Sequence, residues 1–186
     1  MNKTYLSIFL SIVLITLSSC GIGGFVKAYQ SVDKKAGSLN GNVFTTQYNS
    51  YKIGSLDKDW KRISIKKGDL AYFNKVSKST ITLSSDCREA KRRYSLKALS
   101  NSLVVGIKDK KIIERSEFDV DKSVGLYTEY DAVVDDEQIS LATFIYKSEK
   151  CNYDFSYSSS RDKFSDNAEE FIDFISDFEE LSVIDD

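Results

Sequence analysis

The chain has 186 residues, with 26 lysines and arginines against 28 aspartates and glutamates, and its formal net charge is −2. This near balance favours neither nucleic acid nor anionic lipid as a partner of the chain as a whole. The sequence contains no histidine, which excludes the usual Ser-His and Cys-His nucleophilic sites and removes the commonest transition-metal ligand.

The first residues have the pattern of an export signal. Lys3 supplies one positive charge, and residues 6–17 (LSIFLSIVLITL) form an almost wholly apolar run. This run is shorter than the ~20 residues that a membrane-spanning helix needs, and it is typical of the apolar region of a signal peptide. We therefore expect a signal-peptide helix over residues 1–19.

Leu17-Ser18-Ser19-Cys20 resembles the lipobox of bacterial lipoproteins. The resemblance implies that a diacylglycerol is attached to the Cys20 thiol, that the signal is removed before this residue, and that the new amino group is acylated. Each buried CH₂ of such chains contributes about 0.8 kcal/mol to membrane attachment. Gly21 stands where many inner-membrane lipoproteins have aspartate, so the resemblance implies the outer membrane. The alternative is an ordinary secretory signal followed by a chance cysteine.

Residues 20–42 have the composition of a flexible tether with little hydrophobic periodicity. Their glycine-bearing clusters are Gly23-Gly24, Gly37-Ser38 and Asn40-Gly41-Asn42. The remaining residues, 43–186, suit a single domain with one hydrophobic core.

Within that domain the pattern is mostly that of β-strands. Strands are predicted over residues 60–65, 70–73, 80–84, 124–134, 138–146 and 151–158. Lys67-Gly68-Asp69 is a turn signal between the first two strands, and Asp135-Asp136-Glu137 predicts a hairpin between the fourth and fifth. In the last strand, Cys151, Tyr153, Phe155 and Tyr157 alternate with polar residues and are predicted to share one face.

Two helices are predicted among these strands. The first covers about residues 88–103, with Asp86 and Glu89 spaced as a capping box. The second covers about residues 167–181 and is capped by Asp166. Its apolar stripe for burial against the sheet consists of Phe171, Phe174, Ile175 and Phe178. Antiparallel strands with helices between and after them predict an α+β fold in which the sheet packs with two main helices.

The two predicted helices carry opposite charge. The first is basic through Arg88, Lys91, Arg92, Arg93 and Lys97, and the second has nine acids and no base from Asp166 to Asp186. Two solvated faces, neighbouring and mutually attractive, would account for this. A basic docking face for an acidic partner or for lipid headgroups is the alternative.

Cys87 and Cys151 are the only cysteines besides Cys20. Because an exported chain reaches an oxidising compartment, we expect them to form a disulfide. Closing a loop of about 64 residues would contribute roughly 4 kcal/mol to stability. Two small buried core residues are the alternative. A reactive thiol is not expected, since the chain has neither a CxxC spacing nor a histidine.

No catalytic, metal-binding or cofactor-binding residue stands out. Asp131 and the acids of residues 135–137 are interpreted as a hairpin tip rather than a calcium loop, and no carboxylate pair is distinguished for glycoside hydrolysis. Ser64-Ile65-Lys66-Lys67 and Ser165-Asp166-Asn167 match two elements of penicillin-recognising serine enzymes, but the third, K-T-G, is missing downstream. We therefore expect neither enzymatic activity nor a cofactor.

Three segments together resemble uncharacterised lipoproteins of predatory and gliding bacteria. These are residues 68–73 (GDLAYF), residues 80–83 (TITL) leading to Cys87, and residues 151–155 (CNYDF) before a phenylalanine-rich helix. The strand order and the closing helix, with Phe171 and Phe178, also resemble the Mog1/PsbP-like fold. Its members mostly act as binding or assembly factors, and some are bacterial envelope lipoproteins. The resemblance covers most of the chain after Cys20 and carries over no site residue.

These expectations describe a lipid-anchored envelope protein that binds a protein partner or assists assembly, without catalysis. Its expected partners are the membrane, through the lipid anchor, and an unidentified protein; nucleic acid is not expected. Two alternatives stay open. One is a small-molecule or lipid-binding module with a pocket between the sheet and the helix of residues 167–181, and the other is a hydrolase using Ser-Lys or paired carboxylates.

Overall fold

The computed structural model describes residues 37–65, 68–87, 94–121 and 123–183. The expected signal peptide, Cys20 and most of the expected tether lie outside these residues. The described residues form two antiparallel sheets and two α-helices, which confirms the predicted α+β class. Within this part of the chain, no helix has the length and apolar character needed to cross a membrane.

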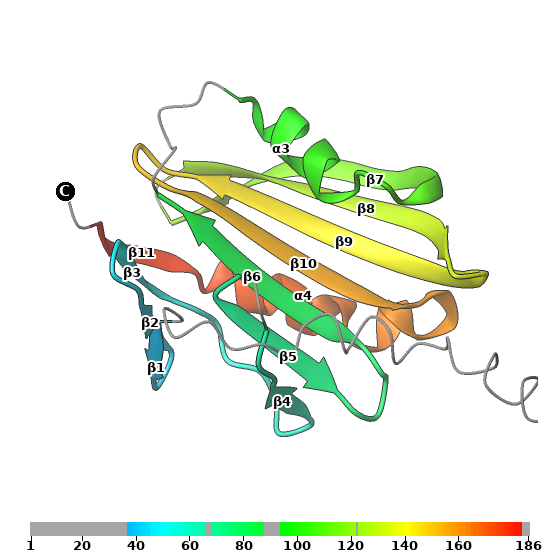
Figure 1. Cartoon of the computed structure of the whole chain (residues 1–186), viewed down its shortest axis with the longest axis horizontal. Coiled ribbons are helices and arrows are strands. Elements are labelled where there is room, and N and C mark those ends of the chain that lie inside the picture. The colour runs from blue at the N-terminus through cyan, green and yellow to red at the C-terminus, as the bar shows by residue number, and fades with distance from the viewer. Residues whose placement is uncertain (1–36, 66–67, 88–93, 122, 184–186) are drawn as a thin grey trace, which may run out of the picture.

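The larger sheet has seven strands in the order β4-β5-β6-β10-β9-β8-β7 (Figure 1). Each neighbouring pair is antiparallel. The strands are β4 (Trp60–Arg62), β5 (Leu70–Asn74), β6 (Thr80–Asp86), β7 (Lys108–Val120), β8 (Ser123–Val134), β9 (Glu137–Lys147) and β10 (Asn152–Ser160). All six strands predicted from the sequence are present in this sheet, and β7 is an additional strand at its edge.

The smaller sheet has four strands in the order β1-β2-β3-β11 and lies beside one end of the larger sheet (Figure 1). Its strands are β1 (Ser38–Asn40), β2 (Val43–Thr45), β3 (Asn49–Lys52) and β11 (Glu179–Val183). β1 lies in the segment expected to be tether, and it is held by pairing with β2 from Ser38↔Thr45 to Asn40↔Val43. Ordered structure therefore begins before Val43.

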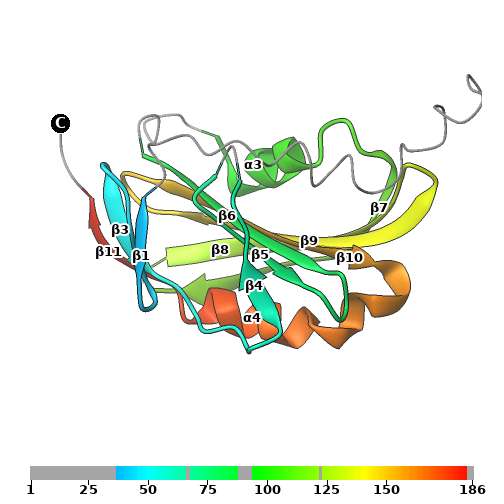
Figure 2. The same cartoon turned by 60° about the horizontal axis from the view of Figure 1, so that its bottom comes forward.

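The helices lie on opposite faces of the larger sheet, so the molecule has three layers (Figure 2). Helix α3 (Leu96–Leu103) covers one face, while the 3₁₀-helix η2 (Arg161–Asp166) and helix α4 (Ala168–Ser176) cover the other. The expectation that the two helices are neighbours is therefore wrong, because the sheet separates them. Of the five basic residues expected in the first helix, only Lys97 lies in α3, and the other four fall within residues 88–93, outside the described residues.

The expected start of the first helix is wrong. Residues 88–93 lie outside the described residues, and α3 begins after Ser95, whose side chain accepts a hydrogen bond of 3.2 Å from the Ala98 backbone N–H. Asp86 is the last residue of β6 and pairs with Asn152 of β10. Glu89, the other residue of the expected capping box, lies outside the described residues.

The second helix is also shorter than expected. Asp166 belongs to η2, and Asn167 precedes α4 without a side-chain capping bond. The helix ends at Ser176, and residues 179–183, expected in part to be helical, form β11 against β3. A free edge on β3 offers the backbone of these residues hydrogen bonds, and this tertiary pairing outweighs their weak helical preference.

The predicted hairpin between β8 and β9 is confirmed. Asp135 and Asp136 have φ angles of 51° and 66°, and Val134 pairs with Glu137 across the turn. Two consecutive left-handed residues match the twist of the flanking strands, and aspartate tolerates this conformation. Glu137 is the first residue of β9 and not part of the turn.

The main core lies between the larger sheet and α4. Cys151, Tyr153, Phe155 and Tyr157 are fully buried on one face of β10, as predicted. The rings of Phe171 and Phe174 on α4, and of Phe178 just after it, pack against this face, with centroids 4.8 Å apart for Tyr153 and Phe178 and 5.3 Å apart for Phe155 and Phe178. Fully burying such a side chain contributes about 1.5–3 kcal/mol. The aromatic stripe of α4 therefore fixes the helix on the sheet.

Candidate functional site

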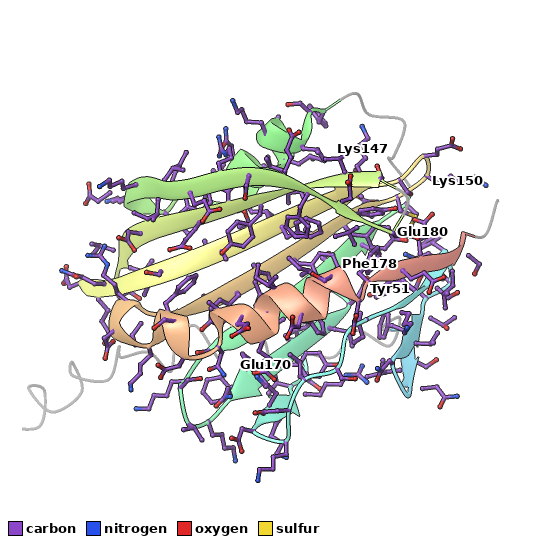
Figure 3. The ribbon with its side chains drawn as sticks, turned by 180° about the vertical axis from the view of Figure 1, so that it is seen from behind. Tyr51, Lys147, Lys150, Glu170, Phe178 and Glu180 are labelled. Carbon is purple, nitrogen blue, oxygen red and sulfur yellow. A yellow bond between two sulfur atoms is a disulfide. The ribbon has the colours of Figure 1, made fainter. Side chains whose placement is uncertain are left out.

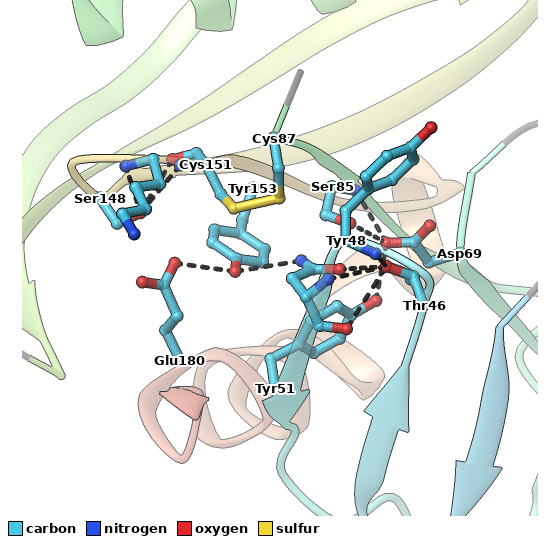
Figure 4. The surroundings of a disulfide bond; sticks show 12 residues. Thr46, Tyr48, Tyr51, Asp69, Ser85, Cys87, Ser148, Cys151, Tyr153 and Glu180 are labelled. Atoms are coloured by element: carbon cyan, nitrogen blue, oxygen red, sulfur yellow. Dashed lines mark hydrogen bonds between the residues drawn. A yellow bond between two sulfur atoms is a disulfide. The ribbon is translucent and has the colours of Figure 1, made fainter. Parts of the chain in front are cut away.

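Cys87 and Cys151 form a disulfide that joins the end of β6 to the start of β10 (Figure 4). Their Cα atoms are 4.0 Å apart, because Cys87 directly follows Asp86 and Cys151 directly precedes Asn152, the register partner of Asp86. Cys151 is fully buried, and the side chain of Ser148 accepts a hydrogen bond of 3.0 Å from its backbone N–H. These two cysteines therefore act as a structural cross-link between neighbouring strands.

Below the disulfide, Tyr153 connects the two sheets through its hydroxyl group (Figure 4). The hydroxyl donates a hydrogen bond of 2.8 Å to the Glu180 carboxylate on β11 and accepts one of 3.2 Å from the side-chain amide of Asn49 on β3. Burial raises the pKa of Tyr153, so the hydroxyl keeps its proton. This arrangement satisfies the tyrosine and holds the smaller sheet in place.

A second buried tyrosine, Tyr51, also connects the two sheets. The Tyr51 hydroxyl on β3 donates a hydrogen bond of 2.8 Å to Asp69, which also accepts bonds from the backbone and side chain of Ser85. Burial raises the pKa of the Asp69 carboxyl, while the bonds from Ser85 and Tyr51 oppose that rise. In Figure 3, Tyr51, Phe178 and Glu180 lie together where α4 gives way to β11. We assign this network to joining the two sheets.

The surface has a small depression of about 210 Å³ beside β4 and the segment that follows β3. It is lined by residues 53–57 together with Gly41, Asn42, Trp60 and Tyr72. The side-chain amide of Asn42 donates a hydrogen bond of 2.9 Å to the Ser55 hydroxyl, and Trp60 and Tyr72 belong to the aromatic packing around α4. The depression therefore presents little side-chain chemistry of its own.

A larger groove, about 350 Å³, lies between α4 and the strands β7 and β8. The Phe174 ring of α4 packs on β5 and β10, and Phe178 after the helix packs on β9, so β7 and β8 extend beyond the face that the helix covers (Figure 3). The groove is lined by Glu114, Ser116, Phe118, Tyr127, Ile172 and Ser176. We refer to this set as the β7–α4 groove.

The floor of the β7–α4 groove is aromatic. Phe118 stacks on Phe144 of β9 with ring centroids 4.6 Å apart, and Tyr127 is 7% exposed. Gly125, the register partner of Phe118, lacks a side chain, and an added Cβ there would collide with the Phe144 ring. The floor is thus held rigidly by core packing while part of its apolar surface stays open.

The rim of the groove is acidic. Glu114 and Glu129 are register partners on the same face of β7 and β8, and the Tyr127 hydroxyl donates a bond of 3.4 Å to Glu129. Burial and the charge of Glu114 raise the pKa of Glu129. Asp131, two residues further along, has its own cation, because Arg161 lies 3.1 Å away. Neither Glu114 nor Glu129 has an ion-pair partner among the described residues.

The disulfide cysteines Cys87 and Cys151 do not line this groove, and neither do the serines of the two rejected motif matches. Cys20 and Lys67 are outside the described residues, while Ser64 follows β4 and Ser165 is in η2, both exposed. Neither serine lines either depression. In the part of the chain that the structure describes, no group of three or more cysteines, aspartates and glutamates is placed to hold a metal ion.

Sequence reasoning missed the groove because it missed β7. The strand's sequence, KDKKIIERSEFDV, has no regular apolar alternation, since β7 is an edge strand with most side chains exposed. The one available signal was local. Glu114, Ser116 and Phe118 lie two residues apart and therefore share a face once the segment is known to be a strand.

No protein-family model matches the chain, and none of the curated proteins compared with it matches in sequence. Solved structures do match. The cyanobacterial PsbP protein (CyanoP) of Synechocystis sp. PCC 6803 is 17% identical over 89% of this chain and 99% of its own, with a TM-score of 0.51. LpqN, involved in cell envelope biogenesis of Mycobacterium tuberculosis, is 10% identical over 72% of this chain and 86% of its own, with a TM-score of 0.55.

A protein of Bacteroides thetaiotaomicron is 13% identical over 71% of this chain, with a TM-score of 0.50, and the match spans 45% of that protein's length. Identities this low establish a shared fold and leave function open. The fold resemblance expected from the strand order and the closing helix is confirmed by these neighbours. The chain has a PsbP/Mog1-like fold.

Proposed function

We propose that this protein is a lipid-anchored envelope protein that binds a protein partner through the β7–α4 groove and catalyses no reaction. The observation that carries the proposal is the groove itself. It combines an aromatic floor, made by the half-buried Phe118 and the buried Tyr127, with the carboxylates of Glu114 and its register partner Glu129, which lack a cation in the described part of the chain. Exposed apolar surface rimmed by polar groups is characteristic of interaction sites.

The anchor part of the proposal is supported by the lipobox-like Leu17-Ser18-Ser19-Cys20. The chain between Cys20 and the first described strand, β1 at Ser38, has the glycine-bearing composition expected of a spacer from the membrane. Gly21 favours the outer membrane. An envelope role is compatible with the similarity to LpqN, whose own description is envelope biogenesis.

The protonation and hydrogen bonding of the buried polar groups favour binding over catalysis. The Tyr51 and Tyr153 hydroxyls have raised pKa values, so each remains a protonated donor to a carboxylate. The carboxylates of Asp69 and Glu180 are in turn held by those bonds. Groups held in this way stabilise the joint between the sheets and are poorly placed for proton transfer to a substrate.

The alternative pocket between the sheet and α4 is disfavoured. Phe171, Phe174 and Ile175 are fully buried, and their neighbours fill the space that a ligand would need. The ring contacts run continuously from Tyr157–Phe171 at 5.6 Å to Tyr146–Phe178 at 5.2 Å. Ligand sites of this kind are usually largely preformed cavities. Binding at the surface groove fits the packing better.

Photo-cross-linking in the native cells tests the proposal. A photoreactive amino acid replaces Ser116 in the full-length chain, and a matched chain carries it at Val76, which is 78% exposed in the β5–β6 turn. We expect one recurrent protein to be cross-linked from position 116 and not from position 76. Equal products from both positions, or none from position 116, would contradict binding at the groove.

The anchor is tested separately on the same cells. Mass spectrometry of the full-length chain should show an acyl mass increment at Cys20. A Cys20→Ala variant should leave the membrane fraction when peripheral proteins are extracted. If the variant stays as firmly bound as the parent, the anchor proposal is wrong, whatever the groove binds.

A further inference from the structure

The kind of partner segment that the β7–α4 groove accepts can be inferred from the strand beside it, and this step rests on the proposed function. β7 is the last strand of the seven-stranded sheet, so one of its edges has no strand partner among the described residues. Such an edge presents unpaired backbone N–H and C=O groups and can pair with an extended chain.

The two halves of β7 differ as edges. The first half is guarded by Lys108, Lys110 and Lys111 and by two register shifts, which are common devices against edge pairing. From Glu114 to Val120, the register with β8 is regular. An extended segment would therefore find a continuous edge only along the half of β7 that borders the groove.

The charges along this half are mainly acidic. Glu114 lies on the groove face, while Glu117 and Asp119 are exposed at the alternate positions, and none of the three has an ion-pair partner in the described part of the chain. Arg115, the one base in this half, is already engaged with Thr128, Tyr130 and Asn101. The edge therefore attracts a basic chain and repels an acidic one.

At the groove, the cross-strand pair Glu114 and Glu129 places two carboxylates opposite each other on one face of the sheet. Like charges directly opposite on one face of an antiparallel pair destabilise the sheet. A cation placed between them would relieve that repulsion. The neighbouring Phe118 and Tyr127 offer an apolar and aromatic surface along which the aliphatic part of a lysine or arginine side chain can lie.

We propose that the β7–α4 groove binds an extended, basic segment of the protein partner. The segment adds to the edge of β7 along Glu114–Val120, and one of its lysine or arginine side chains lies over Phe118 and Tyr127 with its charge between Glu114 and Glu129. Backbone hydrogen bonds to the edge contribute affinity, and the carboxylate pair selects basic over acidic sequences.

Fluorescence anisotropy with two labelled peptides tests this on the detergent-solubilised full-length chain. One probe alternates lysine with valine and the other alternates glutamate with valine. We expect the lysine peptide to bind and the glutamate peptide not to bind. A Glu114→Gln/Glu129→Gln variant should bind the lysine peptide about tenfold more weakly, which corresponds to about 1.4 kcal/mol. A Glu137→Gln/Glu149→Gln variant, with the same charge change at exposed sites away from the groove, should bind like the parent.

Charge reversal gives a second readout that does not depend on loss of binding. A Glu114→Lys/Glu129→Lys variant should prefer the glutamate peptide. Equal binding of the two peptides by the parent, or unchanged binding by the Gln variant, would overturn the inference.

The cross-linking experiment separates this inference from the proposed function. If position 116 captures the same partner with equal yield in the parent and the Glu114→Gln/Glu129→Gln chain, the groove binds a partner but the basic-segment inference fails. If position 116 captures nothing, or only a second copy of this chain or lipid, the proposed function fails as well. A captured partner peptide that is basic, with a yield that falls in the Gln variant, supports both.

Discussion

The indole N–H of Trp60 donates a hydrogen bond of 2.7 Å to Oε2 of Glu170, a residue 110 positions later in the chain. The other oxygen of that carboxylate, Oε1, accepts a bond of 2.7 Å from the backbone N–H of Asp57. Trp60 begins the edge strand β4 and Glu170 lies in the first turn of α4. One side chain therefore ties the helix to both the edge of the sheet and the segment that leads into it.

Glu170→Ala should lower the free energy of unfolding by about 2–3 kcal/mol, because it leaves the Trp60 and Asp57 donors without their acceptor. Chemical denaturation followed by Trp60 fluorescence measures this change, and Trp60 is the only tryptophan in the chain. Glu169→Ala is the matched control, since Glu169 is exposed in the same helical turn. A loss of equal size in both variants would show that the effect comes from the helix terminus and not from these bonds.

Gly54→Ala should destabilise the fold at a second contact between the same segment and α4. The Gly54 backbone N–H donates a bond of 3.2 Å to the Phe174 carbonyl, and an added Cβ would lie 2.6 Å from Phe174 Cα. Because the obstacle is backbone, overpacking should cost about 1–3 kcal/mol or more. Thermal unfolding measures the loss. Gly41→Asn, at a left-handed position with open space around it, should cost much less, and a similar cost at both sites would refute the steric explanation.

Reduction of the Cys87–Cys151 bond should destabilise the protein by roughly 4 kcal/mol, because the disulfide closes a loop of 64 residues in the unfolded chain. Urea denaturation with and without reductant measures this. A Cys87→Ala/Cys151→Ala variant should be insensitive to reductant and close in stability to the reduced parent. If reductant leaves the parent's midpoint unchanged, the bond contributes nothing to equilibrium stability.

Asp154 should make the protein less stable as the pH rises. Burial, with a contribution from the charge of Asp86, raises the pKa of Asp154 from 3.8 to about 6, and its Oδ1 is buried without a hydrogen-bond partner. Between these values the unfolded chain is ionised at this residue while the folded chain keeps the proton. Stability should therefore fall from about pH 4 to pH 6, by on the order of 3 kcal/mol at most.

An Asp154→Asn variant separates this residue from other titrating groups. It should lose the decrease between about pH 4 and pH 6 and melt at a higher temperature than the parent near pH 7. The exposed Asp162→Asn change is the control, because it removes an aspartate from the adjoining η2 helix without altering the burial of Asp154. A parental pH profile in the Asp154→Asn variant would contradict the assignment.

Much of the fold could be predicted from the sequence where one face of an element is buried. The alternation of Cys151, Tyr153, Phe155 and Tyr157 has the period of a strand, and the stripe from Phe171 to Phe178 has the period of a helix. Both patterns arise because only one face of each element is buried away from water. The same reasoning identified the hairpin at Asp135 and Asp136, where the turn needs residues that tolerate positive φ.

Elements without a buried face could not be predicted from the sequence in this way. β7 lies at the sheet edge with most side chains exposed, so its residues show no alternation, and β11 has an acidic sequence that continues the apparent helix. Each is a strand only because a partner, β8 or β3, supplies hydrogen bonds to its backbone. Pairing of this kind depends on residues far away in the chain and leaves no local signal.

The sequence by itself determined the elements with a buried face and the presence of two cysteines able to pair. Only the tertiary structure decided that Asp86 lies opposite Asn152, which brings Cys87 to Cys151. It also decided that Glu114, Phe118 and Ile172 border one groove. The physical reason is that composition and periodicity reflect only whether each residue is buried or exposed to water. A site depends on strand register and helix placement, and these are set by packing across the whole chain.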